Sequence, residues 1–150
     1  MCKMKYSDFI KDSRIRLLVS LGLDTEDFAI YGSGLLWVHN LRPVSDLDVI
    51  VRGEAWERIK QIGSLSSATL NGAPTVRLLG GTLEFTNGWI AGESDVDKLI
   101  DEAEKIYGIP FVRLSYVLSY KRNLKREKDL ADIEAIEEHF NKETCCTHAS

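Results

Sequence analysis

The fold is decided by one stretch of the sequence, Tyr31-Gly-Ser-Gly-Leu-Leu-Trp-Val-His-Asn-Leu-Arg-Pro-Val-Ser-Asp-Leu-Asp-Val-Ile-Val51. It starts at the end of a short apolar run, Phe28-Ala-Ile-Tyr31, which glycines stop, so we expect a strand and then a turn. Residues 35–40 contain no helix breaker and predict a short helix. The proline at position 43 prevents this helix from continuing. Residues 45–51 predict a second strand. The stretch therefore predicts a strand–turn–helix–strand unit.

Helical and strand patterns alternate in the rest of the chain. Further helices are expected over residues 5–21, 54–61, 95–107, 114–123 and 127–140, and the last two are either separate or one bent helix. Residues 75–79 and 82–86 predict two strands joined at a pair of glycines, and residues 108–112 predict a linker or a short strand. This order favours a small α/β or α+β domain with a C-terminal helical segment.

Length and composition favour one soluble domain. The chain has 150 residues, of which 44% are hydrophobic and 28% are charged, and its net charge is −4. These values exclude a disordered or fibrous protein, and the acidic balance gives no general nucleic-acid footprint. We expect a single domain over residues 1–140 and a loose tail over 141–150. The chain shows neither an apolar run of about 18 residues nor a secretory h-region, so we expect a cytoplasmic protein with no membrane partner.

Asp46 and Asp48 lie two residues apart in the second predicted strand. Alternate side chains of a strand share a face, so both carboxylates project together. They repel each other unless a cation lies between them, and Mg²⁺ takes oxygen ligands while keeping waters for substrate phosphates. The alternative is a solvated strand edge, and the pair by itself does not decide between the two.

The turn at Gly32 and Ser33 favours the metal site. Glycine permits a tight turn and the close approach of a ligand to the backbone. The N–H groups at the start of the next helix, together with the Ser33 hydroxyl, suit a terminal phosphate. A lone Gly-Ser is an ordinary turn, but its combination with Asp-x-Asp on the next strand is specific.

Glu84 supplies a third carboxylate if its strand lies beside that of Asp46 and Asp48. Three carboxylates can hold two Mg²⁺ ions about 3.5–4 Å apart, which is the arrangement used for in-line phosphoryl chemistry. The alternative is that Glu84 is a solvent-facing strand residue.

These residues carry a family resemblance. Gly32-Ser33, twelve intervening residues and then Asp46-Leu-Asp48 before Val-Ile-Val resemble the signature of the nucleotidyltransferase (polymerase-beta-like) superfamily. The long spacing, with Arg42 shortly before Asp46, is most similar to the lincosamide-nucleotidyltransferase and AbiEii-toxin-like branches. The resemblance covers roughly residues 28–90 at motif level and extends weakly to residues 120–132.

The resemblance implies a mixed sheet flanked by helices and a Mg²⁺-dependent enzyme, for which Mn²⁺ can substitute. Such an enzyme moves a nucleoside monophosphate from an NTP to a hydroxyl acceptor (a small molecule, RNA or a protein) and releases pyrophosphate. By motif position, Asp46 and Asp48 would ligate metal, and Glu84 would complete the metal site and help to deprotonate the acceptor. Gly32 and Ser33 would hold the triphosphate. The third acid is Glu where the family often has Asp.

Five cations lie within the eight residues from Lys121 to Lys128. At 100° per residue, Lys121, Lys125 and Lys128 share one helix face with Asp132. We expect Lys121, and second to it Lys128, to reach the triphosphate, while the other cations are solvated. Arg42 is expected to order the loop before the acidic strand or to pair with one of its aspartates, as part of the nucleotide site.

Two other functions stay open from the sequence. The chain could be a catalytically inactive protein of the nucleotidyltransferase fold that binds nucleotide or a partner, or a small α/β interaction module whose acidic strand faces solvent. A chain of 150 residues leaves little room for an acceptor domain, so we expect a dimer or a partner protein to complete the cleft. Trp89, just beyond Glu84, is the aromatic residue that a loop could turn toward the nucleotide.

Overall fold

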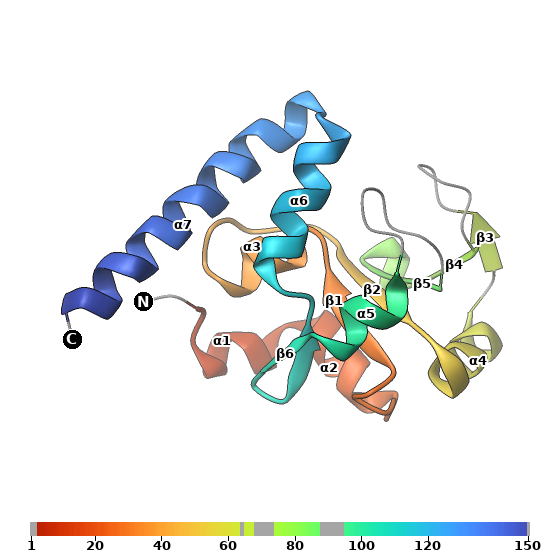
Figure 1. Ribbon diagram of the computed structural model, residues 1–150. Helices are drawn as coiled ribbons and strands as arrows, with labels where there is room; N and C mark the ends of the chain where they lie inside the picture. The colour runs from red at the N-terminus through yellow and green to blue at the C-terminus, as the bar shows by residue number, and fades with distance from the viewer. Residues whose placement is uncertain (1–2, 64, 68–73, 88–94, 150) are drawn as a thin grey trace.

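The fold is a mixed sheet with helices around it (Figure 1). The computed structural model describes residues 3–63, 65–67, 74–87 and 95–149. Within these residues, seven strands follow the order β3-β4-β5-β2-β1-β7-β6. The strands are β1 (Phe28–Tyr31), β2 (Leu47–Val51), β3 (Leu65–Ser67), β4 (Pro74–Leu78), β5 (Leu83–Thr86), β6 (Glu104–Ile106) and β7 (Ile109–Phe111). The pairs β1–β7 and β2–β5 are parallel and the other neighbours antiparallel, so the α/β class is confirmed.

The helices are α1 (Tyr6–Lys11), α2 (Ser13–Ser20), α3 (Gly34–Val38), α4 (Gly53–Ile62), α5 (Val96–Asp101), α6 (Leu114–Leu124) and α7 (Leu130–Ala149), with 3-10 turns at Leu79–Gly81 and Glu127–Asp129. The prediction of one helix over residues 5–21 is wrong. The backbone becomes extended at Asp12, whose carboxylate accepts a hydrogen bond from the Arg14 N–H and caps α2. A good N-cap residue inside a helical pattern therefore starts a second helix.

The strand–turn–helix–strand unit of residues 28–51 is confirmed. β1 and β2 pair antiparallel, and the Gly32–Ser33 turn and α3 connect them. Gly32 has a φ of +67°, which glycine adopts without strain. At Gly34, a Cβ atom would lie 2.7 Å from Ile30 Cγ2, so α3 can pack this closely on the sheet only with glycine there.

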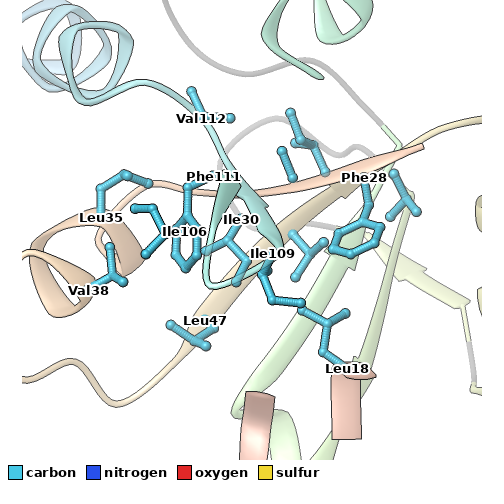
Figure 2. Close-up of a cluster of buried hydrophobic side chains, with 14 of the residues drawn as sticks. Leu18, Phe28, Ile30, Leu35, Val38, Leu47, Ile106, Ile109, Phe111 and Val112 are labelled. Carbon is cyan, nitrogen blue, oxygen red and sulfur yellow. The ribbon is translucent and has the colours of Figure 1, made fainter. Parts of the chain in front are cut away.

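The core extends over both faces of the sheet, because Ala29 and Ile50, which alternate with Ile30 and Val49, are also fully buried. In register across β1, β2 and β5, Ile30, Val49 and Phe85 are all fully buried. Figure 2 shows Leu18 of α2 and Leu35 of α3 in the same cluster as these strands' side chains. Burying each large apolar side chain of this kind contributes about 1.5–3 kcal/mol, so these rows supply much of the stabilisation of the sheet.

Residues 95–107 do not form the single helix that their pattern predicts. α5 ends at Asp101, and residues 104–111 form the hairpin of β6 and β7. Tyr107 and Gly108, at its tip, have φ angles of +52° and +81°, as in a type I′ turn. The spacing of the apolar residues favoured a helix. Residues 104–111 form strands instead because of the tight turn and the pairing of β7 with β1. Of the two alternatives for residues 108–112, a linker or a short strand, the structure shows the strand β7.

The glycine-linked strand pair is confirmed, with a longer connection than a two-residue turn. β4 and β5 are antiparallel, and residues 79–82 join them through a 3-10 turn in which Gly80 has a φ of +64°. This pairing matters for the site because it places β5 between β4 and the acidic strand β2.

The C-terminal segment forms two helices. α6 ends at Leu124 because Lys125 adopts the left-handed conformation, with a φ of +53°. α7 then extends to Ala149, through the residues expected as a tail, because no glycine or proline interrupts it after Leu130. No helix in the described part of the chain is long and apolar enough to cross a membrane.

Candidate functional site

A row of four polar side chains crosses the sheet on the face opposite Ile30, Val49 and Phe85. Tyr31 of β1 pairs in register with Asp48 of β2, Asp48 with Glu84 of β5, and Glu84 with Arg77 of β4. We call these four residues the cross-strand row. The parallel pairing of β2 and β5 confirms the expectation that Glu84 lies beside the acidic strand. Directly opposed side chains of neighbouring strands interact, so the two carboxylates experience each other's charge.

The environment of Asp48 disfavours its ionised form. Burial, and then the charges of Glu84 and Asp46, raise the pKa of Asp48 to about 7, although Lys121 and Arg77 act in the opposite direction. Burial and the Asp48 charge also raise the pKa of Tyr31 well above its ordinary value. A cation beside Asp48 would relieve both the desolvation and the repulsion.

The Gly32–Ser33 turn lies against this carboxylate. A Cβ atom on Gly32 would lie 3.6 Å from Asp48 Oδ2, so the bare backbone of the turn faces the acid. The Ser33 side chain makes no capping bond to α3. Its hydroxyl oxygen instead accepts hydrogen bonds from Lys121 Nζ at 3.3 Å and from Arg42 Nη2 at 3.2 Å. The turn thus joins the acidic strand to two cations from distant parts of the chain.

Two aspartates hold these cations in place. Lys121 Nζ lies 3.2 Å from Asp129 Oδ1 and 3.1 Å from Asp132 Oδ2, and Arg42 binds both carboxylate oxygens of Asp132 at 2.6 and 2.8 Å. We call Ser33, Arg42, Lys121, Asp129 and Asp132 the Ser33 network. The side chain of Lys121 is only 3% exposed and that of Asp129 only 1%. Bidentate and buried pairs of this kind set geometry as well as charge.

The Ser33 network stabilises its carboxylates. Burial works against the ionised form of Asp132, yet hydrogen bonds from Arg42 and Lys121 hold its pKa below the ordinary value. The same holds for Asp129, where burial is outweighed by Arg126 and Lys121. These aspartates are therefore ionised at neutral pH, whereas Asp48, with a pKa of about 7, is partly protonated there.

Most of the residues proposed from the sequence are brought together. Gly32, Ser33, Arg42 and Lys121 meet at the turn, and Asp48 and Glu84 lie beside it. Asp46 lies one residue before β2 and is exposed, but its charge acts on Asp48.

One expectation about the basic cluster is wrong. Lys128 is exposed on the 3-10 turn Glu127–Asp129, and it does not share a helix face with Lys121 because the helix ends between them. Arg42 pairs with Asp132, and no ion pair joins it to Asp46 or Asp48. Trp89 lies outside the described residues.

Three residues of the candidate site were not singled out from the sequence: Tyr31, Arg77 and Asp129. Arg77 Nε lies 3.4 Å from Glu84 Oε2, and this ion pair follows from the register of β4 on β5. The signal for Arg77 was available, because a hairpin at Gly80-Gly81 sets Arg77 opposite Glu84. Nothing in the local sequence indicates that Asp129 turns back onto Lys121 across a break in the helix.

The donor set suits Mg²⁺ in part. Carboxylate oxygens are the ligands this cation prefers, and Asp48 and Glu84 are in register with Asp46 nearby. Among the residues described by the structure, however, no group of three or more His, Cys, Asp or Glu side chains is gathered as a metal site. The Arg77–Glu84 pair is one physical reason, since it draws Glu84 toward β4.

Comparisons of the chain with models of protein families, with curated proteins and with solved structures give no match.

Proposed function

We propose that the protein is a Mg²⁺-dependent nucleotidyltransferase. It transfers a nucleoside monophosphate from an NTP to a hydroxyl acceptor, which is a small molecule, an RNA or a protein, and releases pyrophosphate. One observation carries the proposal: the Gly32–Ser33 turn has the charge-destabilised Asp48 on one side and the buried Lys121 on the other. A metal–triphosphate complex needs these two kinds of group, a carboxylate that prefers a bound cation and cations that face phosphate oxygens.

Each residue has a role in this mechanism. Ser33, Lys121 and Arg42 bind the outer phosphates at the turn, where Gly32 leaves the backbone open. Asp46, Asp48 and Glu84 would hold Mg²⁺, and the ion would supply charge neutralisation at the reacting phosphate. The acceptor oxygen bonds to the α-phosphorus while the bond from that phosphorus to the bridging oxygen of pyrophosphate breaks, and Glu84 takes the acceptor proton. A second subunit or a partner protein completes the acceptor side, and the reaction takes place in the cytoplasm.

The second candidate is a protein of the same fold that binds nucleotide without catalysis. The ion pair of Arg77 with Glu84 favours it, because a paired Glu84 is less available as a metal ligand or base. Arg77→Ala separates the two: it frees Glu84 and leaves the nucleotide contacts of the Ser33 network unchanged. A transferase would keep its turnover or gain in turnover, whereas a binder would show none in either form.

Calorimetric titration with each of the four NTPs and Mg²⁺, followed by a pyrophosphate-release assay, tests the proposal. Asp48→Asn should abolish Mg²⁺-dependent binding, while Asp8→Asn, on the exposed surface of α1, should bind as the parent does. Absence of NTP binding by the parent protein would overturn both candidates. NTP binding without pyrophosphate release in the presence of any acceptor class would favour the second candidate.

A further inference from the structure

A cleft of about 710 Å³ lies away from the Ser33 network. It is lined by the N-terminal residues 3–5, the residue after α3, the β6–β7 hairpin, the start of α6 and the middle of α7. None of its lining residues belongs to the cross-strand row or to the Ser33 network. Clefts of about 300–1,000 Å³ are the size that small-molecule ligands occupy.

Two helices, α3 and α6, run between the cleft and the Ser33 network. His39 follows α3 while Ser33 precedes it, and Leu114 and Lys121 lie seven residues apart on α6. At 1.5 Å per residue, this spacing is about 10 Å along each helix. The cleft and the Ser33 network therefore lie at opposite ends of these two helices.

The rim of the cleft is cationic in a chain whose net charge is −4. Lys3, Lys5, Lys105 and Arg113 line it, against one carboxylate, that of Glu104. Lys105 forms an exposed pair with a glutamate outside the cleft, at 3.5 Å. Within the described residues, no ion pair joins Lys3, Lys5 or Arg113 to a carboxylate. Arg113 Nε donates a hydrogen bond to the Glu102 carbonyl at 2.7 Å, which positions the guanidinium without neutralising its charge.

The start of α6 adds to the positive electrostatic potential of the cleft. Arg113, Leu114 and Ser115 all line the cleft. The side chain of its N-cap residue, Arg113, makes no capping hydrogen bond, and the first turn of the helix carries no acidic residue. A helix N-terminus favours negative charge, which acts here in the same direction as the cations.

The floor of the cleft is apolar and aromatic. Met4, Ile106 and Leu114 are buried there, and the ring of Tyr107 is held by a hydrogen bond from its hydroxyl to the Met4 carbonyl, at 2.6 Å. Lys3 Nζ lies 4.7 Å from the centre of this ring, so a cation and a flat surface adjoin. Such a floor favours an apolar or planar ligand body over a fully hydrated ion.

We propose that this cleft binds a small organic anion, with its phosphate or carboxylate at Lys5 and Arg113 and its planar body against Tyr107 and Leu114. The site is independent of the proposed nucleotidyltransferase site, since they share no residue. The cations and the apolar floor act together, so a ligand needs both parts to bind well.

Phenyl phosphate is a suitable probe because it combines a planar body with a dianion, and phenol and inorganic phosphate represent the two parts separately. Amide NMR spectra recorded during a titration should show shifts clustered at Tyr107, Arg113 and Ser115. We expect phenyl phosphate to bind about tenfold or more tightly than either phenol or inorganic phosphate, because a charged hydrogen bond and ring burial each contribute. Equal affinity for phenol, or for inorganic phosphate, would overturn the proposal.

A pair of matched double variants tests the residues. Lys5→Gln with Arg113→Gln should weaken phenyl phosphate binding about tenfold or more. Lys11→Gln with Arg16→Gln also removes one lysine and one arginine charge, from exposed positions outside the cleft, and should leave binding unchanged. Thermal unfolding of both double variants verifies that they fold. Equal weakening in the two, or shifts centred on Ser33 and Lys121, would overturn the assignment.

Discussion

Two groups of charged side chains flank the Gly32–Ser33 turn, and their aspartates differ in state. In the cross-strand row, burial and like charges raise the pKa of Asp48 to about 7. In the Ser33 network, the pKa of Asp132 is lowered, since hydrogen bonds from Arg42 and Lys121 outweigh its burial. The same residue type is thus destabilised on one side and stabilised on the other. Among the described residues, Asp48 forms no ion pair, whereas Asp132 pairs with both Arg42 and Lys121, and the proposed metal would supply the positive charge that Asp48 lacks.

The largest expected effect comes from breaking the network. Lys121→Ala leaves Asp129 and Asp132 buried without their shared cation. We expect a loss of about 3–5 kcal/mol in the free energy of unfolding, measured by urea denaturation.

A double variant identifies the cause of that loss. Asp129→Asn added to Lys121→Ala should recover part of it, since one unpaired charge is removed. A loss below about 1 kcal/mol in the single variant would contradict the network's structural role.

Removing a charge from the cross-strand row should change the free energy of unfolding in the opposite direction. Asp48→Asn should raise the free energy of unfolding at pH 8 by about 1–3 kcal/mol, because it removes a carboxylate that the fold disfavours. The folded-state pKa lies above the unfolded one, so the destabilisation by Asp48 is absent below pH 4 and grows as pH rises through about 7.

Urea denaturation of the parent and the variant at pH 4, 6 and 8 measures this difference. Saturating Mg²⁺ should reduce it at pH 8 if the cation binds at Asp48. A variant less stable than the parent at pH 8 would show that Asp48 is held by favourable contacts.

Gly32→Ala changes the turn between the two groups. At a φ of +67°, alanine is strained by about 1–2 kcal/mol, while its Cβ would make only an ordinary contact 3.6 Å from Asp48 Oδ2. We expect that loss in stability together with weaker Mg²⁺–NTP binding in calorimetry. Gly80→Ala, at a φ of +64° with open space around it, is the matched control for the strain. Equal NTP affinity in both variants would remove Gly32 from the proposed site.

The smallest effect is expected at Lys128. Its side chain is exposed on the turn before α7, so Lys128→Ala should change the free energy of unfolding by less than about 0.5 kcal/mol. NTP affinity should also stay at the parent's value. A selective loss of NTP over AMP binding in this variant would show that the lysine reaches the phosphates after all.

Local sequence patterns predicted the elements that lie around the turn. The Phe28–Tyr31 strand ends at glycines, and the acidic strand begins after Pro43, so both boundaries follow from residue chemistry. The same method was wrong for residues 95–107. Their apolar spacing fits a helix, and it is pairing of β7 with β1 that makes strands of residues 104–111.

The sequence by itself determined which groups are present: a glycine-serine turn, an Asp-x-Asp strand and a cluster of cations. Residue chemistry is local, so such motifs can be identified without a fold. Tertiary structure alone decided that Lys121, and not Lys128, reaches Ser33, because Lys125 ends α6 in a left-handed conformation. It also decided that Arg77 pairs with Glu84 and that Asp48 is destabilised. Burial and the distances between charges depend on how strands pair and helices pack, and they in turn set the pKa of each carboxylate.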